Sequence, residues 1–216
     1  MENPMNPLET LPAKMFLLAF DPRRGRLTAR NELGYLLRAA ALAELVLNGQ
    51  LRDEDGKAVA VGRAPGGDPV LDALWYDLEG GGPRSWRRLV ERERKQAFHA
   101  VRDQLADARV IKLADARFLG LFPHTRVVLR DTRSARQVAD QVGRAIRGGQ
   151  AQGQVERDTA ALAALAAAGQ LKTVLGARDR RHFKARLDRF AEPVAPVTKA
   201  LRRAVTARRA AIASGG

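Results

Sequence analysis

Two sets of cationic residues have the types and the spacing to bind an anion. The first is Arg38, which lies alone in the middle of an apolar segment, residues 31–51, "NELGYLLRAAALAELVLNGQL". The second follows the spacing i, i+3, i+7 and i+10, which places its members along one face of a helix: Arg92, Lys95, His99 and Arg102. The planar guanidinium group of arginine matches the oxygens of a phosphate monoester and stays charged at neutral pH. If the two sets pack side by side, they form an anion pocket.

A structural explanation competes with this anion pocket. Arg38 could form an ion pair with a buried carboxylate, and the cationic stripe could be an ordinary solvated face of a helix. The residues alone leave both alternatives open.

Other chemistry is poorly represented in the sequence. The chain has no cysteine, which excludes disulfides, thiolate metal sites and cysteine catalysis. Its three histidines are too scattered to indicate a metal centre: His99, His124 and His182. Glycine-rich stretches at 66–67 and 80–82 lack the preceding strand and the following lysine of a phosphate-binding loop, and no hydrolase or metalloprotease motif occurs. We therefore expect no enzymatic activity, no metal and no cofactor.

The charge balance points to a polyanionic partner. Lysine and arginine total 38 against 24 acidic residues, which gives a net charge of +14 and a sequence pI near 11.2. Nucleic acid and an anionic membrane surface are the two main candidates. The first 14 residues do not resemble a signal peptide, and no apolar run approaches the roughly 18 residues of a transmembrane helix. These features predict a cytoplasmic protein.

The elements that must position the cations are mostly helical. Residues 31–49 read as a helix capped by Asn31 and ended by Asn48-Gly49, with apolar residues on most sides, so we expect this helix at the centre of the fold. An earlier helix begins near Pro12, and a short strand is expected at 58–61. Further helices are expected over 69–78, 85–108, 132–147, 154–168, 178–190 and from 197 to the end. The predicted fold is a mainly α, single-domain helical bundle around a central buried helix.

One β-hairpin is expected to protrude from this bundle. Two β-rich runs over 117–129 meet at Pro123-His124-Thr125, where we predict the turn. The hairpin alternates apolar residues with little charge, which makes it a surface for pairing unless it folds onto its own core. Its apolar members are Phe118, Leu119, Leu121, Phe122, Val127 and Val128.

The C-terminal end differs in composition from the rest. Pro193 and Pro196 indicate a boundary, so we divide the chain into a helical domain over 8–192 and a basic tail over 193–216. The tail has an amphipathic pattern with an apolar stripe: Val197, Leu201, Val205 and Ile212. Such a helix could dock on an anionic membrane, fray, or bind a partner, and the sequence does not choose among these roles.

Five stretches of the chain, taken in order, resemble the Golgi phosphoprotein 3 family, also called GPP34. They are "LPAKMFLLAFDPRRGRLT", "LLRAAALAELVLNGQL", "APGGDPVLD", "VRDQLADARVIKL" and "RFLGLFPHTRVVL". The resemblance covers roughly residues 8 to 190 and, with the alanine- and arginine-rich composition, suggests a bacterial member. It implies a helical bundle with a β-hairpin that mediates self-association, and hence a homo-oligomer.

The resemblance also implies a function and a site. Family members are peripheral membrane proteins that recognise phosphatidylinositol 4-phosphate through a tryptophan and three arginines, and they recruit membrane proteins as adaptors. Arg38 and Arg102 match two of those arginines, His99 takes the place of the third, and Arg30 takes the place of the tryptophan. Whether Arg30 and His99 rebuild the pocket or mark its loss stays open.

We therefore expect a cytoplasmic protein on the cytoplasmic face of a membrane, where it binds an anionic phospholipid headgroup and membrane-protein clients. The alternatives are a basic nucleic-acid-binding protein and a protein-interaction scaffold without lipid specificity. Nucleic acid is disfavoured because the charge is spread over the whole length and no helix-turn-helix, zinc or RNP signature occurs.

Overall fold

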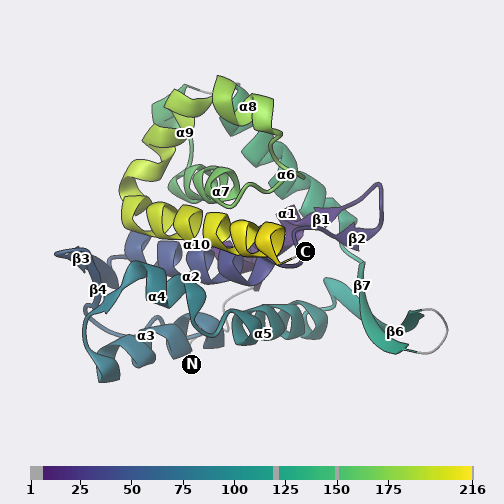
Figure 1. The fold of residues 1–216 in the computed structure, drawn as a ribbon, viewed down its shortest axis with the longest axis horizontal. Helices are drawn as coiled ribbons and strands as arrows, with labels where there is room; N and C mark the ends of the chain where they lie inside the picture. Colours follow the sequence, from purple (N-terminus) through teal and green to yellow (C-terminus); the bar gives the residue numbers. More distant parts are fainter. Residues whose placement is uncertain (1–6, 119–121, 149–150, 216) are drawn as a thin grey trace.

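The computed structural model describes residues 7–118, 122–148 and 151–215, and most of them are helical. Helix α2 (Leu33–Leu47) runs through the middle of the molecule and is buried over most of its length. In Figure 1, α10 (Ala195–Ser214) lies along α2, while a long β-ribbon projects from one side. The expected mainly α bundle around a central buried helix, with a protruding hairpin, is confirmed.

The N-terminal segment leads into the core. After a short 3₁₀ turn, η1 (Pro7–Glu9), helix α1 (Leu11–Leu18) begins with Pro12 in its first turn, as predicted. Thr10 caps this helix because its hydroxyl oxygen accepts a hydrogen bond from the backbone N–H of Ala13. The chain then forms a small antiparallel pair that the sequence did not reveal: β1 (Phe20–Asp21) with β2 (Arg26–Leu27).

The two ends of α2 differ in how well the sequence predicts them. The predicted cap by Asn31 is wrong, because the helix starts at Leu33 and Glu32 occupies the capping position without a side-chain hydrogen bond to the helix. The predicted C-terminal end is confirmed. Asn48 follows the last helical residue, and Gly49 adopts the left-handed conformation, with φ of +72°.

A three-stranded antiparallel sheet lies beside α2. The predicted strand at 58–61 corresponds to β4 (Lys57–Ala60), which pairs with β3 (Leu51–Glu54) and β5 (Arg84–Ser85). Helix α3 (Pro69–Gly81) connects β4 to β5, and Asp68 caps it by accepting hydrogen bonds from the N–H groups of Val70 and Leu71.

The single helix predicted over 85–108 is wrong. Ser85 does cap a helix, but α4 (Trp86–Glu91) ends after two turns and α5 (Arg94–Asp107) begins afresh. Between them Arg92 is extended, and Glu93 takes a left-handed conformation with φ of +52°. Because the helix is interrupted there, Arg92 does not share a helix face with Lys95, His99 and Arg102.

The hairpin is longer than predicted and turns elsewhere. It consists of β6 (Ile111–Phe118) and β7 (Phe122–Leu129), paired from Ile111 with Leu129 to Phe118 with Phe122. The predicted turn at 123–125 is wrong, because these residues lie within β7. Pro123 is tolerated there because the hairpin is two-stranded, so both of its strands are edges. The predicted residues Leu119 and Leu121 lie outside the described part of the chain.

The C-terminal half completes the bundle. Helix α6 (Thr132–Arg147) has the predicted bounds, a short 3₁₀ turn η2 (Gln152–Gln154) follows, and α7 (Arg157–Ala168) begins slightly later than predicted. In place of one helix over 178–190 the chain forms two, α8 (Ala177–His182) and α9 (Lys184–Ala191).

The predicted tail lies against the bundle. A 3₁₀ turn, η3 (Glu192–Val194), leads into α10, whose residues Val197, Leu201 and Val205 are buried while Ile212 is 45% exposed. Most of the apolar stripe of this helix therefore contributes to the core. The division of the chain at residue 193 stays a prediction.

Candidate anion-binding site

Arg38 is buried under the junction between α4 and α5. Its side chain is only 5% exposed. Nε donates a hydrogen bond to the backbone oxygen of Leu89 at 3.0 Å, and Nη1 lies 4.0 Å from Oε2 of Glu93. Nη2 is buried without a hydrogen-bond partner among the described residues. The ion pair that was considered as a structural explanation is therefore present, but it is long and leaves part of the guanidinium group unsatisfied.

The carboxylates near Arg38 are shared among several arginines. Asp77 pairs with Arg84 at 2.5 Å and lies 3.8 Å from Arg92, whose Nε is also 3.2 Å from Glu93. Burial lowers the pKa of Arg38, and the charges of Glu93 and Asp77 oppose that effect. Three arginines thus share two carboxylates, so this cluster keeps a net positive charge.

A second group of cations lines a cleft of about 230 Å³ at the start of α5. Three parts of the chain form it: the segment leading into α2, the first turns of α5, and the C-terminal part of α10. Its lining residues are Arg30, Asn31, Gly34, Arg94, Lys95, Phe98, His99 and Arg208. We call this the basic cleft, because its lining includes four arginine and lysine residues and a histidine but no carboxylate.

The basic cleft depends on a glycine in the central helix. A Cβ atom on Gly34 would lie 2.4 Å from the backbone oxygen of Arg94, so only glycine lets α5 begin this close to α2. The side chain of Arg94 is held there: its guanidinium carbon lies 4.9 Å from the ring centre of Tyr35, and Nη1 donates to the backbone oxygen of Glu91 at 3.2 Å.

The structure brings together two of the four predicted headgroup residues. Arg30 and His99 both line the basic cleft, and both are exposed. Arg102 lies outside the cleft, where it pairs with Asp103 at 2.7 Å and its guanidinium carbon is 6.0 Å from the ring centre of Phe98. Arg38 does not line the cleft either, although it follows Gly34 by four residues and so belongs to the same face of α2.

Three charged or aromatic lining residues escaped the sequence analysis. Arg94 and Phe98 belong to the same short helix as Lys95 and His99, and their proximity in sequence was the only available signal. Phe98 is fixed by stacking on Phe16, with ring centres 5.9 Å apart, and meets the His99 ring edge-on at 5.5 Å. Arg208 comes from α10, and no sequence pattern connects it to α5.

A comparison with known families decides the relationship of this chain. Residues 11–208 match the model of the GPP34 family, Golgi phosphoprotein 3. The chain belongs to the Golgi phosphoprotein 3 family. This match includes every residue of the basic cleft, and it ends at Arg208. No match was found among curated proteins, and a bacterial origin for this Golgi phosphoprotein 3 relative stays a prediction.

The described helices and acidic side chains of this family member limit the roles they can have. None of the helices in the described part of the chain is both long enough and apolar enough to cross a membrane. Among the same residues, no group of histidine, aspartate and glutamate side chains is placed to hold a metal ion.

Proposed function

We propose that this Golgi phosphoprotein 3 family member is a non-enzymatic, peripheral membrane protein. It binds an anionic phospholipid headgroup of the phosphatidylinositol 4-phosphate type in the basic cleft and acts as an adaptor for membrane proteins. The observation that carries the proposal is the basic cleft itself, in which cations from three elements converge without a carboxylate. An anion that enters the cleft therefore meets no competing negative charge among the residues that line it.

The roles of the side chains follow from their positions. Arg30 and Arg208 are exposed, and neither forms an ion pair with a residue that the structure describes, so both can contact phosphate oxygens directly. Phe98 offers an apolar wall on the α5 side. Arg38 attracts the anion at a distance, without contact. Its cluster has an excess positive charge, and because Arg38 is buried, solvent screens that charge less than it screens a charge on the surface. His99 contributes fully only when protonated, which makes it a pH-dependent member of the site.

The test is co-sedimentation with liposomes at about 150 mM salt, a concentration that screens weak surface attraction. Vesicles contain phosphatidylinositol 4-phosphate, phosphatidylserine at matched charge, or neutral lipid alone. For the wild type we expect a preference for phosphatidylinositol 4-phosphate. The double variant Arg30→Gln/Arg208→Gln removes two charges, each worth about 1 kcal/mol near an anionic surface, so binding should fall by at least tenfold.

Two further variants separate a specific site from general attraction. Arg202→Gln removes an exposed charge from α10 that does not line the basic cleft, and it should weaken binding to both anionic lipids equally. Arg38→Met keeps the volume of the side chain but removes its charge, and it should reduce the preference for the phosphoinositide while thermal unfolding verifies the fold. Equal binding to both anionic lipids by the wild type would contradict the proposal.

We propose in addition that the hairpin joins copies of the chain. Each strand of β6–β7 pairs only with the other among the described residues, so neither outer edge is paired with a further strand, although β7 lies close to β2. Val128 is 37% exposed, whereas Val127 is half-buried against the core. Val128→Lys is expected to shift the sedimentation velocity toward the monomer. An unchanged oligomer, or a monomeric wild type, would contradict this part of the proposal.

A further inference from the structure

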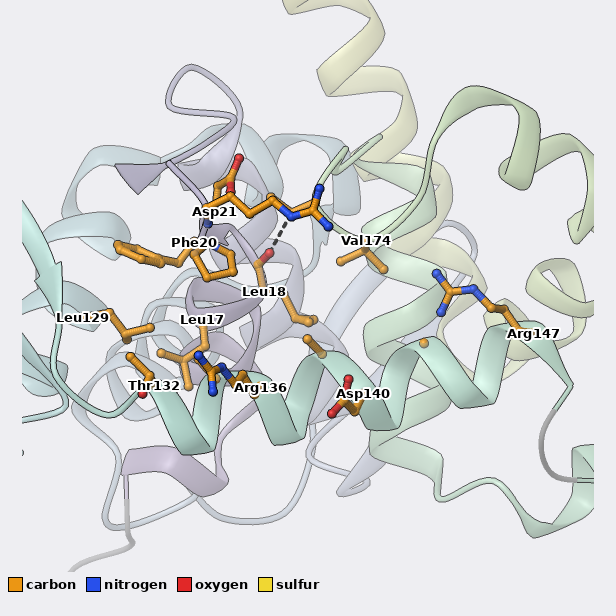
Figure 2. Close-up of a pocket in the computed structure, with 16 residues that line it drawn as sticks. Leu17, Leu18, Phe20, Asp21, Leu129, Thr132, Arg136, Asp140, Arg147 and Val174 are labelled. Carbon is orange, nitrogen blue, oxygen red and sulfur yellow. Dashed lines mark hydrogen bonds between the residues drawn. The ribbon is translucent and has the colours of Figure 1, made fainter. Parts of the chain in front are cut away.

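A second cleft lies away from the basic cleft, between the end of α1, strand β1, helix α6 and the segment that follows α7 (Figure 2). Its volume is about 430 Å³, within the range of sites that hold small molecules. Side chains from four separate segments make its lining largely apolar: Leu17, Leu18, Phe20, Leu129 and Val174. Thr173 closes one side, because its hydroxyl donates a hydrogen bond to the backbone oxygen of Leu18 at 2.6 Å. We call this the α6 cleft.

Cations without ion-pair partners line the α6 cleft. Arg136 and Arg147 come from α6, and Arg23 comes from the turn after β1. In the part of the chain that is described, none of their three guanidinium groups has a carboxylate within 4.0 Å. Figure 2 shows Arg136 and Arg147 near opposite ends of the helix segment that borders the cleft, with Asp140 between them. This arrangement differs from that of Arg38, Arg84 and Arg92, each of which has a carboxylate within 4.0 Å.

The carboxylates in the α6 cleft do not neutralise these cations. Asp21 accepts hydrogen bonds from the backbone N–H groups of Arg23 and Arg24, at 2.9 and 3.2 Å, and lies 3.7 Å from Nε of Arg24. The Asp21 carboxylate is therefore occupied by the backbone and the arginine of its own turn, and it does not pair with the arginines of α6. Asp140 is the one remaining carboxylate among the lining residues. The three arginines of the lining therefore outnumber Asp140, the carboxylate that is not bound to its own turn. The cleft has an excess of positive charge next to its apolar residues.

A glycine on α6 leaves room for the side chain of Arg147. Gly143 is buried, and a Cβ atom there would lie 2.7 Å from Nη1 of Arg147. Because this position has no side chain, the Arg147 guanidinium group can fold back along the helix over Gly143 and reach the cleft. Any other residue at 143 would push the guanidinium group away.

We propose that the α6 cleft binds a single-chain anionic amphiphile. The apolar chain lies on the floor formed by Leu17, Leu129 and Val174, and the carboxylate or phosphate head pairs with Arg136 or Arg147. Burial of the chain supplies most of the binding free energy, and the charge-assisted hydrogen bonds select the anionic head. This site shares no lining residue with the basic cleft, so its function does not depend on headgroup recognition.

Isothermal titration calorimetry of the full chain tests the site. The probe is dodecanoate, kept below the concentration at which it forms micelles. Acetate, which lacks the chain, and dodecyl glucoside, which lacks the charge, serve as comparisons. We expect dodecanoate to bind at least tenfold more tightly than either compound. The variant Arg136→Gln/Arg147→Gln should weaken dodecanoate binding by at least tenfold, and Ala139→Phe should block it by filling the cleft.

The control variant lies on the same helix. Arg144→Gln removes an exposed charge of α6 that does not line the cleft, and it should bind dodecanoate as the wild type does. Equal affinity for dodecanoate and dodecyl glucoside, or equal loss in the Arg144 variant and the double variant, would overturn the proposal. Binding of phosphatidylinositol 4-phosphate vesicles should be unchanged in Ala139→Phe, which separates this site from the basic cleft.

A competition experiment distinguishes the two sources of such a ligand. Phosphatidylcholine vesicles that contain lysophosphatidic acid are added to the dodecanoate complex, and phosphatidylcholine vesicles alone correct for the uptake of dodecanoate by the bilayer. Displacement of dodecanoate supports the site with a membrane as the source of the amphiphile. Retention of dodecanoate supports the site with a free fatty acid in solution as the source.

Discussion

Replacement of Gly34 by alanine is expected to lower the free energy of unfolding by about 2 kcal/mol, although alanine is the better helix former. The new Cβ would lie 2.4 Å from the oxygen and 3.0 Å from the carbonyl carbon of Arg94. Backbone atoms cannot rotate away as the end of a side chain can, so α5 must shift relative to α2. Overpacking of this kind costs about 1–3 kcal/mol, which exceeds the gain of up to about 1 kcal/mol from helix propensity. Urea denaturation followed by circular dichroism measures the difference.

The matched control is a glycine in another helix. Gly80 lies near the end of α3, and a Cβ atom there would meet nothing within 4 Å. Gly80→Ala should therefore raise the free energy of unfolding by up to about 1 kcal/mol. Equal stability of the two variants would mean that α2 and α5 do not approach as closely as the structure has them.

The Gly34 variant also probes the basic cleft. Arg94 and Gly34 both line the cleft, so a displaced α5 would separate Arg94, Lys95 and His99 from Arg30. In a Gly34→Ala protein that is still folded, the preference for phosphatidylinositol 4-phosphate over phosphatidylserine should fall. The close helix contact would then connect a packing requirement in the core to the proposed function at the surface.

Elements with strong local signals could be predicted from the sequence. Helix α6 has the expected bounds because Asp131 can cap its start and Gly148 its end, while Val142 and Ile146 recur on the buried face. The central position of α2 followed from apolar residues on most of its sides. In both cases hydrophobic period and terminal residues agree with the tertiary structure.

Features that depend on tertiary contacts could not be predicted. The break between α4 and α5 places Glu93, a residue without a steric preference for φ of +52°, in the left-handed region. Its carboxylate thereby lies near Arg38 and Arg92, an arrangement with no local sequence signal. The predicted position of the hairpin turn is wrong because a local signal was present but misleading. Pro123 is typical of a turn, but an edge strand accommodates it.

In the candidate site, too, the residues grouped by spacing in the sequence could be predicted in part, and those brought together by tertiary packing could not. The periodic spacing correctly grouped Lys95 and His99, and the family resemblance added Arg30. The same spacing failed for Arg92. The helix break separates Arg92 from the other members of the stripe, and Arg92 forms ion pairs with Asp77 and Glu93 instead. Arg208 joins the cleft because α10 packs along α2, and a contact between residues so far apart in sequence has no periodic signature.

Glu44 is a partly buried titratable group whose effect on stability depends on pH. It lies on α2, and its carboxylate accepts a hydrogen bond from the backbone N–H of Leu11 at 2.8 Å, at the start of α1. Burial raises the pKa of Glu44 to about 7; the Leu11 hydrogen bond opposes this shift, and the nearby charges of Asp68 and Asp158 reinforce it. In the unfolded chain the pKa is that of ordinary glutamate, near 4.5.

The sign of the effect follows from these two pKa values. A carboxyl group whose pKa is higher in the folded state adds stability below its unfolded pKa and loses that contribution as the pH rises through the folded pKa. Between about pH 4.5 and pH 7, folding therefore becomes less favourable by an amount of order 2–3 kcal/mol. Glu44→Gln removes the ionisation but keeps an oxygen that can accept the Leu11 hydrogen bond.

We expect Glu44→Gln to be about 2 kcal/mol more stable than the wild type at pH 8 and nearly equal to it at pH 5, measured by urea denaturation at both values. Glu79→Gln, at an exposed position on α3, serves as the control and should keep the pH dependence of the wild type. A stability difference for Glu44→Gln that is the same at both pH values would mean that Glu44 ionises as it does in water. Since the Leu11 hydrogen bond favours the ionised carboxylate, the predicted result would also show that the cost of burying this charge outweighs the hydrogen bond that joins the start of α1 to the central helix.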